Sequence, residues 1–217
     1  MFIAFEGIDA SGKATQSKLL AKKLNATLFS FPDYSTPCGK LILSHLKEEW
    51  VASPSGFRML SLEENKENIK YVNDMVFQAL QFTNRLEKAE ELSAALKVGH
   101  VVADRYIASA IVYGGADGLS TEYLEKTQRT LKQPDLNVLL DVDPKISSTR
   151  RPDRRDRYEM DDLMSVRAAK YRELWVNMRA KSTQKKASNW VIVDGRPSVE
   201  EIHGDILQII KESRFGA

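Results

Sequence analysis

Short apolar runs alternate along the chain with longer stretches in which apolar residues recur at helical spacing. The apolar runs predict buried strands at residues 2–6, 27–31, 100–103, 137–141 and 190–194. The helical spacing predicts helices at residues 13–24, 39–50, 62–97, 121–131, 144–149, 158–179 and 198–211. Glycines at positions 114, 115 and 118 are expected to break the helix that follows residue 106. Five strands joined through right-handed helical crossovers predict an α/β fold, a five-stranded parallel sheet flanked by helices on both faces.

Composition narrows the class of protein. The chain has 217 residues, 42% of them hydrophobic, which allows one α/β domain or two small ones, and we favour a single domain over residues 1–217. The apolar runs are shorter than the roughly 18 residues that span a bilayer. The chain opens on a strand pattern, so we expect no membrane partner, no secretory signal and a cytoplasmic location. The single cysteine, Cys38, excludes an intrachain disulfide and a cysteine-cluster metal site. A formal net charge of +2 argues against a nucleic-acid partner.

A glycine-bounded loop joins the first predicted strand to the first predicted helix. Gly7 is followed by four residues and then by Gly12 and Lys13, which is the spacing of a phosphate-binding loop. Glycines let backbone N–H groups turn toward a polyanion, and the following helix points its positive end at the same place. Lys13 would then reach the outer phosphates of a nucleoside triphosphate as a point charge. The candidate ATP-binding residues are Gly7, Ile8, Asp9, Ala10, Ser11, Gly12, Lys13, Ala14 and Thr15.

One position departs from the usual loop. A Ser or Thr normally follows the lysine and places its hydroxyl on Mg²⁺, whereas this chain has Ala14. Thr15 comes one residue later and points about 100° away around the helix, so it is no simple substitute. The departure weakens the expectation of Mg²⁺ more than the expectation of phosphate. An ordinary glycine turn is the plainer interpretation, but the order of strand, two glycines, lysine and helix argues against it.

Charged residues mark two further candidate sites. Asp104 and Arg105 follow the third predicted strand, where an aspartate can hold Mg²⁺ and an arginine suits a phosphate. A helix-capping aspartate beside an exposed arginine is the simpler alternative, and the phosphate loop in the same chain favours function. The arginine-rich run at residues 150–157 is bracketed by two predicted helices. It predicts a basic lid over phosphates at about residues 144–160, with a solvated loop or a nucleic-acid patch as the alternatives.

The combination of motifs resembles the thymidylate kinase family, whose members phosphorylate dTMP with ATP. The resemblance spans almost the whole chain, and its segments appear in the family order. They are Phe5-Glu6-Gly7-Ile8-Asp9 with Gly12-Lys13, residues 31–36, Asn84-Arg85, Asp104-Arg105-Tyr106 with Ser109 and Tyr113, residues 140–144, residues 156–159 and Val193-Asp194. This resemblance implies the P-loop nucleoside monophosphate kinase fold, commonly as a homodimer, with ATP and dTMP as substrates and Mg²⁺ as cofactor.

On the ATP side, the resemblance implies that Lys13 and its loop hold the phosphates. Asp9 matches the loop carboxylate near the acceptor phosphate and Mg²⁺, and Asp104 matches the carboxylate associated with Mg²⁺. Family members that lack a basic residue inside the loop, where this chain has Ala10, usually supply a catalytic arginine from the lid. The implied catalytic residues are Lys13, Asp9 and Arg105, with Arg150, Arg151, Arg154 and Arg155 as the candidates from the lid.

On the dTMP side, Arg105 matches the arginine that grips the phosphate, Arg85 the arginine that contacts the thymine edge, and Tyr113 the aromatic ring under the deoxyribose. The other implied contacts are Asp9, Phe31, Tyr34, Phe82, Ser109 and Glu159. The family's thymine-stacking phenylalanine usually lies four residues before the arginine, where this chain has Gln81. Phe82 lies one residue later, which leaves the stacking residue open.

Three alternatives to a dTMP kinase follow from the same residues. The nearest is a kinase of broader specificity for nucleoside monophosphates. A nucleotide-dependent switch protein is a second, but the guanine-reading Asn-Lys-x-Asp pattern has only a near match at residues 65–68, which lacks the aspartate. A nucleic-acid binder that uses the arginine run is disfavoured by the near-neutral charge. We therefore expect in-line transfer of the γ-phosphate of ATP to dTMP by positioning and charge neutralisation.

Overall fold

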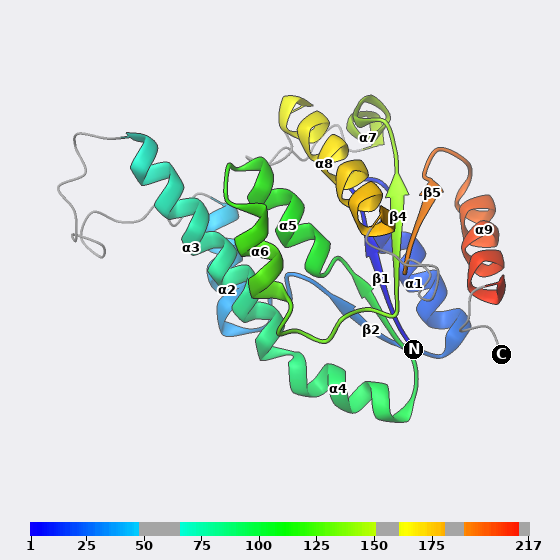
Figure 1. Cartoon of the computed structure of the whole chain (residues 1–217). Coiled ribbons are helices and arrows are strands. Elements are labelled where there is room, and N and C mark those ends of the chain that lie inside the picture. The colour runs from blue at the N-terminus through cyan, green and yellow to red at the C-terminus, as the bar shows by residue number, and fades with distance from the viewer. Residues whose placement is uncertain (48–65, 151–160, 181–188, 213–217) are drawn as a thin grey trace.

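The computed structural model describes residues 1–47, 66–150, 161–180 and 189–212, which form a five-stranded parallel sheet between layers of helices (Figure 1). The strands are β1 (Phe2–Glu6), β2 (Thr27–Ser30), β3 (Val101–Asp104), β4 (Leu136–Asp141) and β5 (Trp190–Asp194). Their order in the sheet is β2-β3-β1-β4-β5, and every neighbouring pair is parallel. The expected α/β fold is confirmed.

The central strand places the site. All five residues of β1 are buried, and β1 pairs with β3 on one side and with β4 on the other. The chain visits β2 and β3 on one side of β1 before it crosses to β4 and β5. In open parallel sheets, ligands bind beyond the carboxyl ends of the strands at the point where the order reverses. That point lies here at the end of β1, next to the register pair Phe5 and Asp104.

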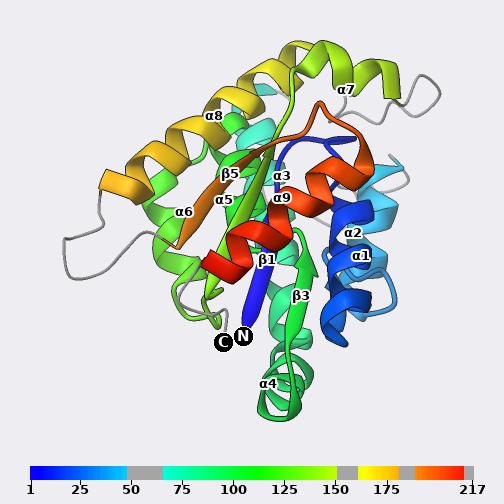
Figure 2. The same cartoon turned by 90° about the vertical axis from the view of Figure 1, so that its right-hand side faces the viewer.

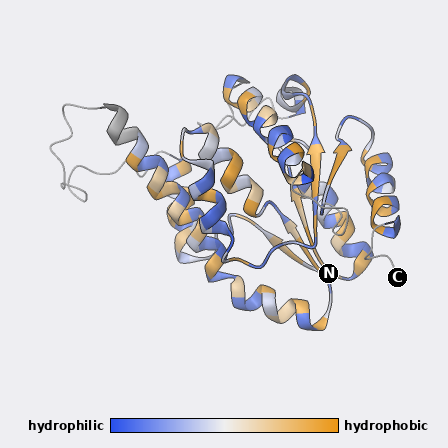
Figure 3. Cartoon of the chain, viewed as in Figure 1, coloured by the Kyte–Doolittle hydropathy of each residue, from blue (hydrophilic) through white to orange (hydrophobic). Residues whose placement is uncertain are grey.

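Two apolar clusters hold helices against the two faces of the sheet (Figure 2). On one face, α1 (Lys13–Leu24) and α9 (Val199–Glu212) bury Leu20 and Ile206 against Ile3 and Phe5. The opposite face is covered by α4 (Ala89–Val98), α5 (Ile107–Ala116), α6 (Thr121–Gln128) and α8 (Asp161–Ala180). Figure 3 shows the strands as hydrophobic, as expected for a sheet covered on both faces. Within the described ranges, no helix is long and apolar enough to cross a membrane.

Three further helices lie near the carboxyl edge of the sheet. They are α2 (Pro37–Leu46), α3 (Lys66–Glu87) and α7 (Pro144–Arg150). Helix α3 packs against both α2 and α5, to the side of the sheet seen on the left in Figure 1. Thr36 caps α2 by accepting a hydrogen bond from the Gly39 N–H at 3.0 Å, so this helix begins two residues earlier than its apolar pattern predicts.

The single helix predicted for residues 62–97 is wrong, because the chain breaks at Lys88 between α3 and α4. The Lys88 ammonium lies 3.5 Å from the Asp33 carboxylate and also pairs with Glu91. The turn rotates α4 so that Leu92 becomes fully buried in the core beneath the sheet. Long-range contacts therefore override a continuous helical pattern. Residues 62–65 lie outside the described part of the chain, as do 48–50 and 158–160 of two other predicted helices.

The predicted helix break at Gly114 and Gly115 is also wrong. Helix α5 continues through both glycines to Ala116, and the left-handed residue that follows is Gly118, with φ of 94°. A Cβ at Gly114 would lie 2.8 Å from the Leu124 side chain and 3.1 Å from Cδ of Gln78. This glycine therefore allows close helix packing instead of ending the helix. The other boundaries shift by a few residues, with β3 one residue later and α6 ending at Gln128.

We expect Gly39→Ala to destabilise the protein. A Cβ at Gly39 would collide with the carbonyl oxygen of Asp33 and lie 2.8 Å from Cα of Tyr34. Since the loop at residues 31–36 must then move, the free energy of unfolding should fall by about 1–3 kcal/mol. Gly204→Ala is the matched control, because nothing lies within 4 Å of a Cβ at this position inside α9. It should gain up to about 1 kcal/mol in urea denaturation; a loss of similar size from both variants would contradict this account.

Candidate active site

The loop from Gly7 to Gly12 links β1 to α1 and takes backbone conformations that favour glycine. Gly7 has φ of 141° and Gly12 has φ of 101°. A Cβ at Gly7 would lie 2.6 Å from the carbonyl oxygen of Leu140, so a side chain has no room there. Gly12 caps α1, which places the positive end of the helix at the loop. A cavity borders this loop and is lined by residues 9–16 together with Asp104, Arg105, Arg150 and residues at the start of α9 and directly before it.

Lys13 is folded back over the loop. Its side chain is 5% exposed, and its ammonium donates hydrogen bonds to the Ile8 carbonyl (2.5 Å) and to Ser11 Oγ (3.3 Å). Burial, with the nearby charge of Arg105, lowers the pKa of Lys13 to about 7. A polyanion bound at the loop would restore the charged form.

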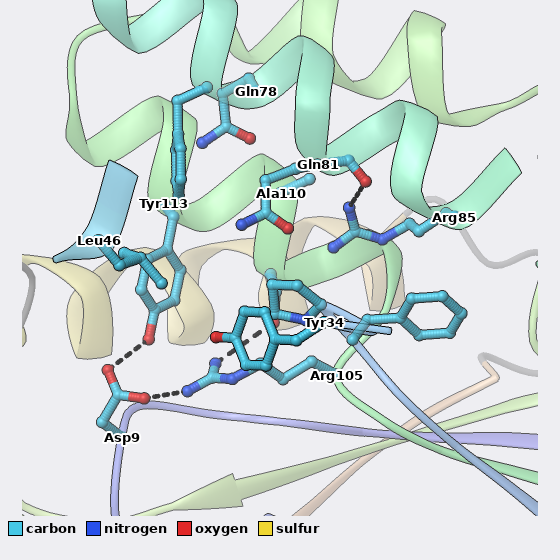
Figure 4. A pocket seen from close by; sticks show the side chains of 13 residues that line it. Asp9, Tyr34, Leu46, Gln78, Gln81, Arg85, Arg105, Ala110 and Tyr113 are labelled. Carbon is cyan, nitrogen blue, oxygen red and sulfur yellow. Dashed lines mark hydrogen bonds and ion pairs between the residues drawn. The ribbon is translucent and has the colours of Figure 1, made fainter. Parts of the chain in front are cut away.

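Asp9 links three elements at the end of β1. It forms an ion pair with Arg105 of the β3–α5 connection and accepts a 2.8 Å hydrogen bond from the Tyr113 hydroxyl of α5 (Figure 4). Arg105 also donates to the Gly7 carbonyl at 3.2 Å. Burial alone would raise the pKa of Asp9, but the charges of Arg105 and Lys13 outweigh it and hold the pKa below its usual value. The site therefore keeps Asp9 ionised and Arg105 aimed at the phosphate loop.

A buried carboxylate fixes the backbone that carries Arg105. Arg105 has φ of 63°, a left-handed conformation that a bulky residue keeps only where its surroundings hold it. Glu6 is completely buried at the end of β1, and it accepts hydrogen bonds from the N–H groups of Tyr106 (2.9 Å) and Ala108 (3.1 Å). It also accepts from the Ser109 hydroxyl at 2.6 Å. Its negative charge lies at the N-terminus of α5, where the helix dipole stabilises it.

Arg85 of α3 holds the same backbone segment from the other side. Its guanidinium donates to the Tyr106 carbonyl from Nε (3.1 Å) and Nη2 (2.7 Å), and to the Gln81 carbonyl from Nη1 (2.6 Å). Burial lowers the pKa of Arg85 to about 10, and its Cζ lies 5.9 Å from the centre of the Phe31 ring. Tyr106 is thus held at its N–H by a buried anion and at its carbonyl by a buried cation.

A second cavity lies between α3 and α5 and adjoins the first. It is lined by seven of the residues predicted to contact dTMP, namely Asp9, Phe31, Tyr34, Arg85, Arg105, Ser109 and Tyr113. Asp9 and Arg105 line both cavities, so the two spaces meet at this ion pair. Ser109 lines the cavity with its hydroxyl already bonded to Glu6 and within 3.0 Å of the Tyr171 hydroxyl.

Phe82 does not line this cavity, although it was predicted to contact dTMP. It packs against the core cluster beneath the sheet, whereas Gln81 faces the cavity (Figure 4). One residue along a helix turns a side chain by about 100°, which carries Phe82 away from the face that holds Gln81 and Arg85. Asn84, which belongs to the same motif, is fully buried and exchanges hydrogen bonds with the backbone of Asp33 (2.9 and 3.0 Å). It therefore shapes the loop that carries Phe31 and Tyr34.

The predicted metal and lid residues lie around the phosphate-loop cavity, as far as they are described. Asp9 and Asp104 both line it, and in the described ranges no group of three or more His, Cys, Asp and Glu residues could hold a metal ion. Two carboxylates beside a phosphate site suit Mg²⁺, which is usually held by one or two carboxylates together with phosphates and waters. Arg150, at the end of α7, donates to the carbonyls of Gly195 (2.8 Å) and Ala10 (3.4 Å). Outside the described residues lie Arg151, Arg154, Arg155 and Glu159.

Three residues of the site had no role assigned from the sequence. Glu6 stands at the end of a buried strand, and nothing in the pattern reveals its partners on α5. Arg167 of α8 is fully buried, with its Cζ 4.3 Å from the centre of the Tyr113 ring and its Nη2 3.8 Å from the Asp117 carboxylate. An arginine within a charged helix normally predicts a solvated face. Gln78 could have been found, since it precedes Gln81 by three residues and Arg85 by seven on one helical face.

Comparison with known proteins decides the family. A model of the family described as thymidylate kinase matches residues 5–206.

The chain belongs to the thymidylate kinase family.

Relatives from distant organisms agree with this assignment. The thymidylate kinase of Schizosaccharomyces pombe is 30% identical, over 96% of this chain and 90% of its own length. A probable thymidylate kinase of Methanocaldococcus jannaschii is also 30% identical, over 97% of this chain and 96% of its own. The structure of Candida albicans thymidylate kinase superposes with a TM-score of 0.75 at 26% identity, covering 100% of this chain and 93% of that one. Membership of this family makes the chain an ATP-dependent phosphotransferase of the dTMP kinase type. It does not favour the two alternatives, a monophosphate kinase of broader specificity and a nucleotide-dependent switch protein.

We expect Lys13 to take up a proton when nucleotide binds. The pKa of Lys13 is about 7 in the protein alone, and bound phosphates raise it by favouring the charged form. Affinity that depends on this proton is greatest below pH 7 and declines as the pH rises above 7. At pH 8, calorimetry of Mg-ATP binding in buffers of different ionisation enthalpy should report an uptake close to about one proton per nucleotide. Lys13→Met should abolish the uptake; equal uptake by both proteins would contradict the assignment.

Proposed function

We propose that this thymidylate kinase family member transfers the γ-phosphate of ATP to dTMP at the point where its two cavities meet. The observation that carries the proposal is that Asp9 and Arg105 line both cavities. A donor phosphate held at the loop and an acceptor phosphate held in the other cavity would then face each other across this ion pair. In phosphoryl transfer the protein forms few covalent bonds itself. Its main contributions are to align the donor and acceptor phosphates and to neutralise their negative charge.

On the donor side, the loop N–H groups and Lys13 would hold the ATP phosphates. Asp104, with Asp9, would hold Mg²⁺, which supplies positive charge beside the phosphates when bound. Asp104 is better placed than Asp9 for this role, because both Asp9 oxygens already accept hydrogen bonds from Arg105 and Tyr113. Ala14 and Thr15 also line this cavity.

On the acceptor side, Arg105 would bind the phosphate of dTMP, and its fixed backbone would aim the planar guanidinium for two parallel hydrogen bonds. Arg85 would meet the thymine. Of its five N–H groups, three donate to backbone carbonyls, and the other two belong to Nη1 and Nη2 beside the cavity. Tyr113, held by Asp9, would face the deoxyribose, and Phe31 and Tyr34 would border the nucleoside from the loop after β2.

The remaining parts of the proposal rest on the family resemblance. One kinase domain would span residues 1–217, with a lid at about 144–160 that supplies the catalytic arginine. Arg150 is the lid candidate that the structure describes, and it lies at the phosphate loop through its bond to Ala10. We also propose Mg²⁺ dependence, a cytoplasmic location and a homodimer, the last of which light scattering would test.

The proposal is tested by ADP release from Mg-ATP with dTMP, dUMP, dCMP, dGMP, UMP and AMP as acceptors. We expect turnover of dTMP and a strong preference for it over dCMP, because Arg85 offers only donors, which suit the thymine carbonyls and reject the amino group of cytosine. Similar turnover of all six acceptors would remove the roles given to Arg85 and Tyr113. No turnover of any acceptor, despite ATP binding, would contradict the proposed reaction.

The same assay on Arg105→Lys isolates the acceptor phosphate. Lysine keeps the charge but loses the paired hydrogen bonds, so kcat/KM for dTMP should fall by about 10–100-fold, which corresponds to about 1.5–3 kcal/mol. Arg129→Lys is the matched control, since the side chain of Arg129, directly after α6, is 74% exposed and lies 3.9 Å from its partner Glu125. Unchanged kinetics for Arg105→Lys, or equal losses in the two variants, would refute the phosphate role.

A further inference from the structure

One polar side chain in the cavity between α3 and α5 has no hydrogen-bond partner among the residues that the structure describes. Gln78 of α3 is only 5% exposed, and among the described residues neither Nε2 nor Oε1 of its amide finds a hydrogen bond. Buried amides are nearly always satisfied, and an unsatisfied one is destabilising. A position as buried as this one ordinarily holds an apolar residue, as the neighbouring position does with Phe77. The amide therefore points to a ligand group that completes its hydrogen bonds.

The surroundings of Gln78 hold its amide in the cavity wall. Gly114 of α5 leaves no side chain between the two helices, and a Cβ there would lie 3.1 Å from Gln78 Cδ and 3.2 Å from its Cγ. Gln78, Gln81 and Arg85 share one face of α3, and all three line the cavity. Figure 4 shows Gln78 and Gln81 reaching into the cavity from α3, on the side opposite Asp9 and Arg105. An acceptor phosphate at Arg105 would therefore leave the nucleoside facing the amides.

We propose that Gln78 is a substrate-binding residue that reads the base of the acceptor monophosphate. An amide presents a donor and an acceptor side by side, as does the imide edge of thymine or uracil, with N3–H beside a carbonyl oxygen. Gln78 supplies the acceptor for N3–H and the donor for the neighbouring carbonyl, a pairing that the donor-only Arg85 cannot make. Phe82 packs against the core cluster and does not line the cavity, whereas Gln78 and Gln81 do, so α3 presents amides to the base. The inference rests on the proposed placement of dTMP in this cavity.

The first test is Gln78→Met, which keeps the length and flexibility of the side chain and removes its hydrogen bonds. We expect the KM for dTMP to rise about tenfold, with the KM for ATP unchanged. The melting temperature of the empty protein should rise, since an unsatisfied buried amide has been removed. A residue with a purely structural role would lower the melting temperature and leave the KM for dTMP unchanged. That result would overturn the inference.

The matched control is Gln128→Met. Gln128 of α6 is also buried, at 2% exposed, and its Oε1 has no hydrogen-bond partner in the part of the chain that the structure describes, but it does not line the cavity. Its replacement should leave the KM for dTMP unchanged. A rise in that KM equal to the rise in Gln78→Met would show a general packing effect and would overturn the inference.

The second test uses the monophosphate of N3-methylthymidine, which lacks the N3–H donor. The wild-type protein should bind it about tenfold more weakly than dTMP in calorimetry, whereas Gln78→Met should distinguish the two ligands much less. Equal discrimination by both proteins would mean that the methyl group is excluded by shape, which contradicts the pairing. If Gln78→Met does not fold, Gln78→Leu serves in the same comparison. Turnover of dTMP by the wild-type protein distinguishes the proposed function from the role of Gln78. If the wild-type protein does not turn over dTMP, the proposed function is wrong. If it does, the variants test only whether Gln78 binds the base.

Discussion

The carboxylate of Glu6 is the constraint on which the site depends. It is fully buried at the end of the central strand, and it holds the start of α5 through the N–H groups of Tyr106 and Ala108. Arg85 closes the same connection through the Tyr106 carbonyl. A buried charge is destabilising unless hydrogen-bond donors surround it, and here the donors come from the backbone and side chain at the start of α5. This arrangement positions Arg105, whose left-handed backbone turns its side chain toward Asp9 and the phosphate loop.

The charges of the site are matched to anions on both sides. Lys13 and Arg105 both lie near Asp9, which forms an ion pair with Arg105, and burial already lowers the pKa of Lys13. Two bound phosphates would place negative charge beside these cations. Their attraction would be strong, because the site is largely shielded from water. The same logic extends to Gln78, whose amide has no hydrogen-bond partner within the described part of the chain. Such groups lower the stability of the empty protein and contribute to binding.

The sequence was sufficient wherever the information is local. The glycine spacing before Lys13 predicted the phosphate loop, and short apolar runs predicted the five strands. It was insufficient wherever a residue's role depends on a distant partner. Lys88, where the helix breaks, pairs with the distant Asp33, and Gly114 lets α5 pack closely against Gln78 and Leu124. The assignment of Phe82 to the dTMP site came from the family pattern, whereas the turn of α3 packs the half-buried ring against the core cluster. The helical spacing could have indicated Gln78, but only the structure shows that its amide has no hydrogen-bond partner among the described residues.

The most direct test of this account is a double-mutant cycle between Glu6→Gln and Arg105→Ala, read as kcat/KM for dTMP at a temperature where all four proteins are folded. If Glu6 acts by positioning Arg105, Glu6→Gln should lower kcat/KM in the wild-type background and have little further effect once the Arg105 side chain is absent. Strong coupling between the two changes is the predicted result. Additive losses would mean that Glu6 affects the reaction independently of Arg105, and would contradict the claim that a buried carboxylate aims the phosphate-binding arginine.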